Sequence, residues 1–441
     1  MSSPSVRIFP AVIAAASALL AGCLAGLAPA RAQESAAAPE VVDLPVLLRL
    51  VRDASPRLAV ERQAISGAEA NLITAGAYPN PTINYGRYRP SGGQAGTLFE
   101  GTRQEQATLE VPLLIAGQRS ARVEKAEREI EAARARVASG ASSLGAEAGA
   151  AFVALLAAQE KASLLSNANE ELARLRNIVA GREASGVASR YDLTRLDVEL
   201  GGSRARLEDA KADVSDRAGN LAALLGLTNW RPRAAGKLSP LSLDAGALAK
   251  PRDRAVTSPA TVAAIREETA AQSGVEVARR ERWPVPSVSA GRSWTTDPFG
   301  AANFMGLSVE IPILDTRRGQ LARAEADSIT ATLRRELAQA EVAANLERLA
   351  SVIAARQASL QRFEQEAASR LPSLKQMAED AYRLGRSSIL ELLDSTRARY
   401  DLQQTRIDLV AALYEAQLRF LATSGDLERA VGVAESDPVR R

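Results

Sequence analysis

Few residues of this chain could do covalent or metal chemistry. Among its 441 residues there is no histidine, and the one cysteine is Cys23. Soft-metal sites need histidine or cysteine ligands, and Ser–His or Cys–His catalysis needs the same residue types. The chain also lacks a P-loop, a GxGxxG fingerprint and a GxSxG nucleophile elbow. We therefore predict that the protein is not an enzyme and that it binds neither a metal ion nor a cofactor.

The remaining candidates are electrostatic. Glu391 and Asp394 are three residues apart, so a helix would place both carboxylates on one face, where they would attract cations and repel anions. The alternative is a solvated helix face, because such acidic pairs are common in a chain with 24% charged residues. A formal net charge of only +3, mixed along the chain, gives no sign of a nucleic-acid partner.

The sequence pattern of the elements that would position these carboxylates occurs twice in the chain. Four short markers recur with offsets of 203, 205, 200 and 199 residues, which indicates an internal duplication. The pairs are Ser55-Pro56 with Ser258-Pro259, residues 78–81 with 283–286, residues 109–112 with 309–312, and Gly186 with Gly385. We assign the two repeats to residues 44–228 and 256–428, with a Pro- and Gly-containing linker at 229–255 and a C-terminal tail at 429–441.

Each copy opens with a predicted helix and continues with two strands. The helices, Leu44–Ala77 and Ala260–Arg282, should end at prolines, which lack an N–H and clash with the preceding turn. Apolar and polar residues then alternate in Gln106–Val111, Ser287–Trp294 and Phe304–Ile311, which predicts strands with one apolar and one polar face. Glu110 and Glu310 fall on the polar face. Eight of the 17 aromatic residues lie in Gly76–Val111 and Glu281–Ile311, which fits aromatic girdles of a sheet that spans a membrane. The alternative is a small sandwich with aromatic filling.

Long helical hairpins should follow the strands. Pro112 precedes Gly186 by 74 residues and Pro312 precedes Gly385 by 73, and a helix over such a stretch would be about 100 Å long. Heptad spacing of apolar residues beyond each glycine predicts coiled-coil packing. The glycines should form the hairpin turns because they adopt positive φ without strain, and Pro372 should kink the second hairpin.

The N-terminal segment predicts export from the cytoplasm. Arg7 precedes an apolar, alanine-rich run from Ile8 to about Ala28, the pattern of a secretory signal. Ordinary signal peptidase would cleave after Ala32, which makes residues 1–32 the signal. A lipobox at residues 20–23 would instead end the signal at residue 22 and place a lipid on Cys23. The sequence leaves both alternatives open.

Four strands cannot close a barrel, and an open sheet edge is not tolerated in lipid, so membrane-spanning strands would have to be shared by several chains. The duplicated unit and the need to share membrane strands between chains both resemble the TolC family of outer-membrane efflux proteins. The resemblance covers roughly Leu44 to Glu428. Residues 78–81, Tyr-Pro-Asn-Pro, also resemble the heavy-metal-efflux branch of that family.

The resemblance implies a mainly α fold with a small β part, built from a duplicated helix–strand–strand–helix repeat. Long coiled-coil hairpins would form a periplasmic α-barrel, and four strands per chain would join a twelve-stranded outer-membrane β-barrel shared by a homotrimer. Pro112 and Pro312 would mark the junction between barrel and helices.

The resemblance also implies which residues act at the hairpin tips. The periplasmic gate would involve Asp192, Tyr382, Glu391 and Asp394, the last two as acidic rings around the pore. Ser387 replaces the family's latch arginine, and Arg386 or Arg190 could substitute. The adaptor-contact residues would be Gly186, Val187, Ala188, Leu384, Gly385 and Arg386.

The function implied is a passive exit duct in the bacterial outer membrane, in contact with lipid there, for substrates such as metals or drugs. They would arrive from an inner-membrane pump of the resistance–nodulation–division (RND) type and a periplasmic adaptor. One alternative is the outer-membrane duct of a type I protein secretion system. Another is a periplasmic coiled-coil adaptor or scaffold, which would have one hairpin and more β-structure than this chain.

Overall fold

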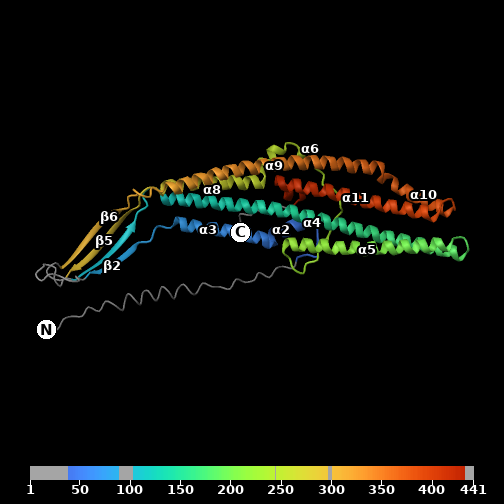
Figure 1. The fold of residues 1–441 in the computed structure, drawn as a ribbon, viewed down its shortest axis with the longest axis horizontal. Coiled ribbons are helices and arrows are strands. Elements are labelled where there is room, and N and C mark those ends of the chain that lie inside the picture. The colour runs from blue at the N-terminus through green and yellow to red at the C-terminus, as the bar shows by residue number, and fades with distance from the viewer. Residues whose placement is uncertain (1–37, 89–102, 244, 296–299, 433–441) are drawn as a thin grey trace, which may run out of the picture. The chain divides into compact units, whose positions relative to one another are not determined.

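The computed structural model describes residues 38–88, 103–243, 245–295 and 300–432. The predicted signal, with Cys23 and both cleavage sites, lies outside the described residues, as does the end of the predicted tail at 433–441. The chain from Pro39 onward forms one unit. In that unit a small sheet lies at one end of a set of long helices, and the hairpin tips lie at the other end (Figure 1).

The fold is mainly α with a small β part, as predicted, and the same order of elements occurs twice. The first copy contains α2 (Leu44–Ala54), α3 (Pro56–Gly76), β2 (Thr82–Tyr88), β3 (Gln104–Pro112), α4 (Gln118–Ala184) and α5 (Arg190–Leu225). The second contains α7 (Pro251–Thr257), α8 (Pro259–Arg280), β5 (Pro286–Thr295), β6 (Gly300–Val309), α9 (Arg318–Glu366), α10 (Leu371–Arg383) and α11 (Ile389–Ser424). The short helix α12 (Leu427–Val431) follows.

The long helices pack side by side in four rows. The central helix α4 lies between a row made of α3 and α5 and a row made of α8 and α11, and α9 lies beyond the row of α8 and α11. The paired helices meet end to end. A Cβ added at Gly226, just past α5, would lie 3.2 Å from Pro56 of α3, and one at Gly425, past α11, would lie 3.0 Å from Pro259 of α8.

Those prolines correct the predicted opening helices. The expected Leu44–Ala77 helix is two helices, because Ser55 is extended and Pro56 starts a new helix at its first position. In the second copy α8 begins at Pro259 after an extended Ser258, and ends at Arg280. Both α3 and α8 end before the Pro-x-Pro segments, as predicted.

A four-stranded antiparallel sheet carries the predicted alternation. The strand order is β2-β3-β5-β6, and the register places Ile83, Leu109, Ala290 and Met305 in one row across it. The next row, on the opposite face, is Thr82, Glu110, Ser289 and Gly306. Within the described residues, β2 and β6 each pair on one side only. Near the helices, one face of the sheet is therefore apolar and the other polar, whereas Arg87, Glu105 and Arg292 lie farther out on the apolar side. Within the described residues the sheet has two unpaired edges.

The predicted strand Phe304–Ile311 runs too far. β6 ends at Val309, which pairs with the first residue of β5, Pro286. Beyond that point the opposite chain runs into Pro284, which has no N–H to donate to a ladder. Glu310 therefore lies outside the strand, whereas Glu110 lies within β3 and accepts a hydrogen bond from Ser308 Oγ at 3.2 Å.

Pro372 breaks the second hairpin. The helix α9 stops at Glu366, a 3-10 turn covers Ala368–Arg370, and α10 starts at Leu371 with Pro372 in its first turn. The ring of proline excludes the carbonyl hydrogen bond of a continuous helix, so the predicted kink is a complete interruption.

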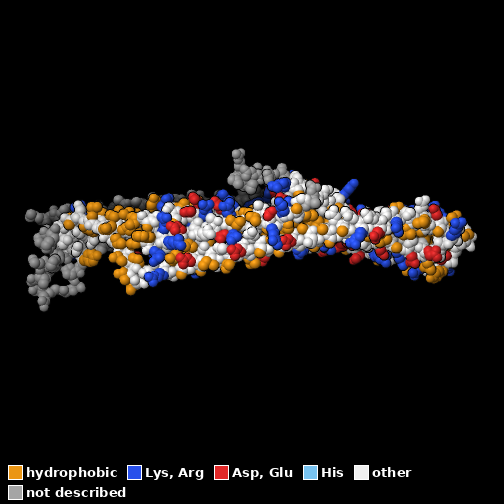
Figure 2. Space-filling model, turned by 90° about the horizontal axis from the view of Figure 1, so that it is seen from above, with side chains coloured by type: hydrophobic (Ala, Val, Ile, Leu, Met, Phe, Trp, Pro, Cys, Tyr) orange, Lys and Arg blue, Asp and Glu red, His pale blue; other side chains and the backbone are white. Residues whose placement is uncertain are grey.

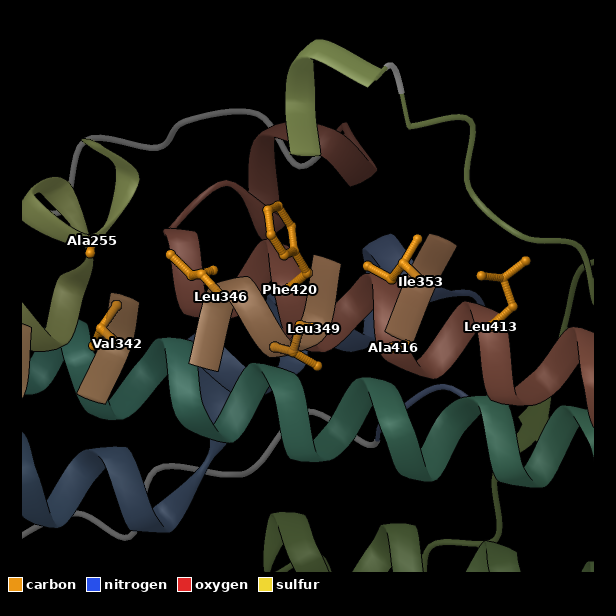
Figure 3. Packing of buried hydrophobic residues seen from close by; sticks show 8 residues of the cluster. All are labelled: Ala255, Val342, Leu346, Leu349, Ile353, Leu413, Ala416 and Phe420. Carbon is orange, nitrogen blue, oxygen red and sulfur yellow. The ribbon is translucent and has the colours of Figure 1, made fainter. Parts of the chain in front are cut away.

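A buried cluster joins the middle of the second hairpin. In Figure 3, α9 and α11 face each other and α7 covers one end of the contact. The cluster consists of Ala255, Val342, Leu346, Leu349, Ile353, Leu413, Ala416 and Phe420. The segment predicted as a linker thus contributes Ala255 to the core.

A belt formed by the N-terminal segment and residues 229–243 crosses the helices. The strand β1 (Val41–Val42) pairs in parallel with β4 (Arg233–Ala234). Trp230 Nε1 donates to the carbonyl of Pro39 at 2.9 Å. The buried amide of Gln417 on α11 accepts from Leu241 N at 2.8 Å and donates to Leu241 O at 2.9 Å, which ties the belt to the second hairpin.

One described helix, α4, is long and apolar enough to cross a membrane by length and composition alone. However, 56% of its most apolar window is buried inside the protein. The packing of α4 between two helical rows therefore explains its apolar character.

Candidate functional site at the hairpin tips

The two hairpin turns have the same backbone design. Gly186 and Gly385 adopt φ of 71–74°, the left-handed region that favours glycine. In the first turn, Gly186 N donates to Glu183 O and Val187 N to Arg182 O, both at 2.8 Å. Gly385 and Arg386 repeat these bonds in the second turn, so both tips are Schellman caps. Gly186 and Gly385 therefore form the hairpin turns, as predicted, because these turns require a positive φ.

Serine caps start the returning helices. Ser189 Oγ accepts from Asp192 N, and Asp192 Oδ2 accepts from Ser189 N, both at 3.2 Å, which makes a capping box. Ser388 Oγ likewise accepts from Glu391 N at 3.3 Å. Asp192 and Glu391 are therefore equivalent positions, the third residues of α5 and α11. Their offset of 199 equals that of the two glycines, a signal of this equivalence that is present in the sequence.

An apolar cluster holds the two tips together. Leu392 and Leu393, next to Glu391, are buried against the first hairpin. The buried members are Leu172, Val179, Leu196, Leu200, Ile389, Leu392 and Leu393. Because this cluster contains residues of both hairpins, the two tips of one chain form a single packed unit.

Tyr382, Asp192 and Arg182 come together at this unit. The Arg182 guanidinium carbon lies 5.1 Å from the centroid of the Tyr382 ring, within cation–π range. Burial raises the pKa of the Tyr382 hydroxyl and the Asp192 carboxylate raises it further, whereas Arg182 opposes the shift. The structure thus brings the predicted acid and tyrosine together with a cation from the end of α4.

Arg182 was not among the residues predicted from the sequence. Arg386 and Arg190 were the candidates because they lie beside Ser387 or its counterpart, but both are exposed and neither forms an ion pair among the described residues. Arg182 lies four residues before Gly186, in the last turn of α4. A signal existed there, since a basic residue is favourable at a helix C-terminus, but nothing in the sequence linked it to Tyr382.

Glu391 and Asp394 both point outward. They are exposed, while Leu392 and Leu393 between them are buried. Asp394 Oδ1 lies 3.9 Å from Arg397 Nη1, with 77% of the Asp394 side chain exposed. The two carboxylates therefore share the open face of α11, as their spacing predicts.

The predicted adaptor-contact residues lie at the turns. Val187, Leu384 and Arg386 are exposed, as are both glycines, whereas Ala188 packs on the apolar tip cluster. Tyr191 and Leu390, which the sequence analysis did not select, add further exposed apolar area. The tips thus present apolar side chains next to carboxylates.

Behind the tips, two partly buried ion clusters connect the hairpins. On α5, Glu199 accepts from Arg397 of α11 through Nε at 2.9 Å and through Nη2 as well. The hydrogen bond from Arg397 holds the pKa of Glu199 below its ordinary value, against the opposing effect of burial. The Glu199 side chain is only 8% exposed.

The second cluster surrounds Glu171 on α4. Glu171 accepts from Arg399 and, at 2.8 Å, from the hydroxyl of Tyr400, and Lys375 of α10 lies 3.5 Å away. Burial would raise the pKa of Glu171, but the bonds from Arg399 and Tyr400 outweigh it and lower the pKa. Arg397 and Arg399, two residues apart on α11, therefore bind both helices of the first hairpin.

The junction prolines differ in their setting. Pro112 is the last residue of β3 and pairs with Ser287, six residues before α4 begins. Pro312 lies three residues beyond β6, in the segment that leads to α9.

In the part of the chain that the structure describes, no three His, Cys, Asp or Glu side chains are grouped so that they could hold a metal ion.

Known proteins resemble this chain in sequence and in fold. Residues 47–227 match the family model of outer membrane efflux proteins. The chain is 26% identical over 384 residues to the cobalt-zinc-cadmium resistance protein CzcC of Cupriavidus metallidurans, which covers 85% of this chain and 87% of that protein. It is 24% identical to the pyoverdine export outer membrane protein OpmQ of Pseudomonas putida, over 85% of each chain.

Solved structures share the fold. The outer-membrane channel OprN superposes with a TM-score of 0.70 at 21% identity, covering 87% of this chain and 90% of that one. Likeness at this identity supports the fold alone, which contains the same mainly helical body and small sheet.

Proposed function

We propose that this chain, a member of the outer membrane efflux (TolC) family, forms the exit channel of a tripartite efflux system. It is an outer-membrane protein with a large periplasmic helical part. The family is one of transport channels, not of enzymes. The observation that carries the proposal is the sheet at one end of the long hairpins, which has two unpaired edges among the described residues and, near the helices, one apolar and one polar face.

The oligomer follows from the sheet edges. An unpaired edge cannot face hydrocarbon because its backbone N–H and C=O groups would lack partners. Pairing β6 of one chain with β2 of the next satisfies both edges, and three chains give the twelve strands of a closed barrel. The apolar face, with Ile83 and Met305, faces lipid, and the polar face, with Glu110, lines the pore.

The gate lies at the hairpin tips. In a trimer, Glu391 and Asp394 form rings of three carboxylates around the pore, and Tyr382 with Asp192 and Arg182 holds the tips in the closed arrangement. Opening requires the tips to move apart, and contact of an adaptor with the exposed residues around Gly186 and Gly385 supplies the free energy. This assignment rests on the packing of Tyr382 against Arg182 and on the exposed acidic face of α11.

The partners and the cargo are further parts of the proposal. A periplasmic adaptor and an inner-membrane pump of the RND type deliver substrate, and metal cations are the favoured cargo class. The relative CzcC, named for cobalt, zinc and cadmium resistance, supports this choice, as does the acidic tip, which favours cations. Residues 44–228 and 256–428 act as the two repeats, joined by the equatorial segment 229–255.

The test is conductance of the purified protein in planar bilayers. We expect cation-selective channels, from a species that cross-links as a trimer, and lower cation selectivity in Glu391→Gln/Asp394→Asn. The matched control is Glu208→Gln/Asp216→Asn, a similar loss of two exposed carboxylates on α5, away from the tips. A stable monomer that forms no channel would refute the exit-channel function.

A further inference from the structure

Exposed apolar side chains form a band between the sheet and the helices. Both copies contribute an aromatic residue before the Pro-x-Pro segment, Tyr78 or Trp283, and aliphatic residues after the strands. Ile313 is 76% exposed and Leu314 fully exposed. Figure 2 shows hydrophobic side chains gathered toward this end, with basic and acidic side chains beyond them. The junction band consists of Tyr78, Leu113, Ile115, Trp283, Ile311, Ile313 and Leu314.

Arginines without carboxylate partners lie directly beside the junction band. These arginines lie in the first turns of α4, at the end of α8 and at the start of α9. In the described part of the chain none of them forms an ion pair. By contrast, Arg280 pairs with Glu276 at 2.7 Å. The arginine collar consists of Arg119, Arg122, Arg279, Arg282, Arg317 and Arg318.

Local contacts orient the collar without neutralising it. Arg119 Nε donates to Gly76 O at 2.7 Å, and its guanidinium carbon lies 4.9 Å from the Tyr78 centroid. Arg317 donates through Nη1 to the carbonyl of Glu281. The carboxylate of Asp315 accepts from the backbone N–H of Arg317 at 2.9 Å, so it caps its own loop. The collar therefore keeps a surplus of positive charge.

We propose that the junction band and the arginine collar bind the periplasmic leaflet of the outer membrane, with the guanidinium groups on anionic phospholipid headgroups. Tryptophan and tyrosine favour the bilayer interface, and arginine matches phosphate oxygens with paired N–H donors. Along the protein, the sheet is followed by the junction band and then by the arginine collar. Across a bilayer, the hydrocarbon core is likewise followed by the interface and then by the headgroups. The proposal rests on the proposed function, because the sheet must be the membrane-spanning part.

Lipid retention tests the proposal with the full-length protein. The protein is reconstituted into vesicles of equal parts phosphatidylcholine and phosphatidylglycerol, re-extracted in mild detergent, and its retained lipids are quantified by mass spectrometry. We expect phosphatidylglycerol to be enriched over the bulk mixture. In Arg282→Gln/Arg318→Gln the enrichment falls by about fivefold per arginine removed, since one basic side chain gains that much near an anionic surface. High salt weakens the enrichment in the unmodified protein.

A matched control removes two exposed arginines away from the sheet, Arg204→Gln/Arg362→Gln, and should keep the enrichment. Equal enrichment in Arg282→Gln/Arg318→Gln and the unmodified protein overturns the proposal. Loss of the trimer in that variant without a change in lipid preference also overturns it, because the arginines would then contact a second copy. Channel conductance is measured in the same vesicles. Conducting channels without phosphatidylglycerol preference refute the lipid site alone, whereas absence of conductance refutes the proposed function.

Discussion

Arg397 on α11 donates two hydrogen bonds to Glu199 on α5 from one edge of its guanidinium, from Nε to Oε1 at 2.9 Å and from Nη2 to Oε2. The two residues belong to different hairpins and are 198 positions apart in the sequence. The Glu199 side chain is only 8% exposed, and Arg206 on its own helix lies farther away, at 3.9 Å. The pair therefore couples the position of α11 to that of the first hairpin.

Removing the arginine should be costly. In Arg397→Gln, Glu199 stays in a poorly solvated site without its main donor, and we expect a loss of about 1–3 kcal/mol in the free energy of unfolding. Thermal unfolding of the detergent-solubilised protein measures it. Arg174→Gln is the control, because Arg174 and Glu170 form a 3.7 Å pair with side chains 67% and 65% exposed. That change should cost less than about 0.5 kcal/mol, and equal losses in both variants would contradict a special role for Arg397.

Acid should loosen the hairpin contact. The pKa values of Glu171 and Glu199 are lowered from 4.5 in the folded protein, so the unfolded chain takes up protons more readily. Their stabilisation is therefore complete above about pH 4.5 and is lost as the pH falls through the folded pKa values. Melting temperatures recorded at decreasing pH should drop in this window, and the drop should be smaller in Glu199→Gln. A drop of the same size in that variant would assign the acid sensitivity to other carboxylates.

The hairpin glycines should resist substitution. Gly385→Ala is expected to cost about 1 kcal/mol from backbone strain alone, since φ is +71° and no atom lies within 4 Å of the added Cβ. Gly181→Ala provides a control inside α4, with equally free space and helical backbone, and should be neutral or stabilising. Thermal unfolding compares the two. A neutral Gly385→Ala would show that the turn adopts another backbone conformation.

Arg182 should bias the closed channel. Loss of the contact with Tyr382 in Arg182→Gln removes a cation–π interaction of about 0.5–1 kcal/mol per subunit, so the ratio of open to closed time should rise by about two- to fivefold for each subunit. Single-channel recording measures that ratio. Arg190→Gln, an exposed arginine on the same tip, should leave it unchanged. Similar effects in both variants would point to the general charge of the tip.

Pro372 should control the break in the second hairpin. In Pro372→Ala the residue regains an N–H and loses the clash of its ring, which together disfavour a continuous helix by about 3 kcal/mol. We expect α9 and α10 to join, with slower amide hydrogen exchange at residues 367–371. Unchanged exchange there would mean that packing against α11, and not the proline, interrupts the helix.

Much of the fold could be predicted because its signals are local. Proline positions predicted where α3 and α8 end, alternation predicted β3 and β5, and each hairpin glycine marks its turn. The break at Ser55-Pro56 was missed because the apolar pattern continues on both sides of it. The local signal for the break was Pro56, which keeps Ser55 extended, and the contact of Pro56 with Gly226, 170 residues later in the chain, accompanies it.

The candidate site was less accessible to sequence reasoning for the same physical reason. Asp192 and Glu391 could be selected from their place after the turn glycines, since caps are local. The cation at Tyr382 could not, because Arg182 approaches it from the other hairpin. A local comparison could consider only neighbours in sequence, Arg190 and Arg386, and both point away into solvent.

The belt has a consequence for how the protein matures. Hydrogen bonding joins Trp230 to Pro39, a separation of 191 residues, and Val41 pairs with Arg233. If the chain is exported N-terminus first, Pro39 reaches the periplasm long before Trp230. The segment around Pro39 therefore has no β4 partner until the whole first hairpin has crossed the inner membrane. Such distant pairings are slow to form and leave apolar surface open to aggregation in the meantime. Periplasmic chaperones that hold the leading segment would therefore matter most during the interval before residue 233 has crossed the inner membrane.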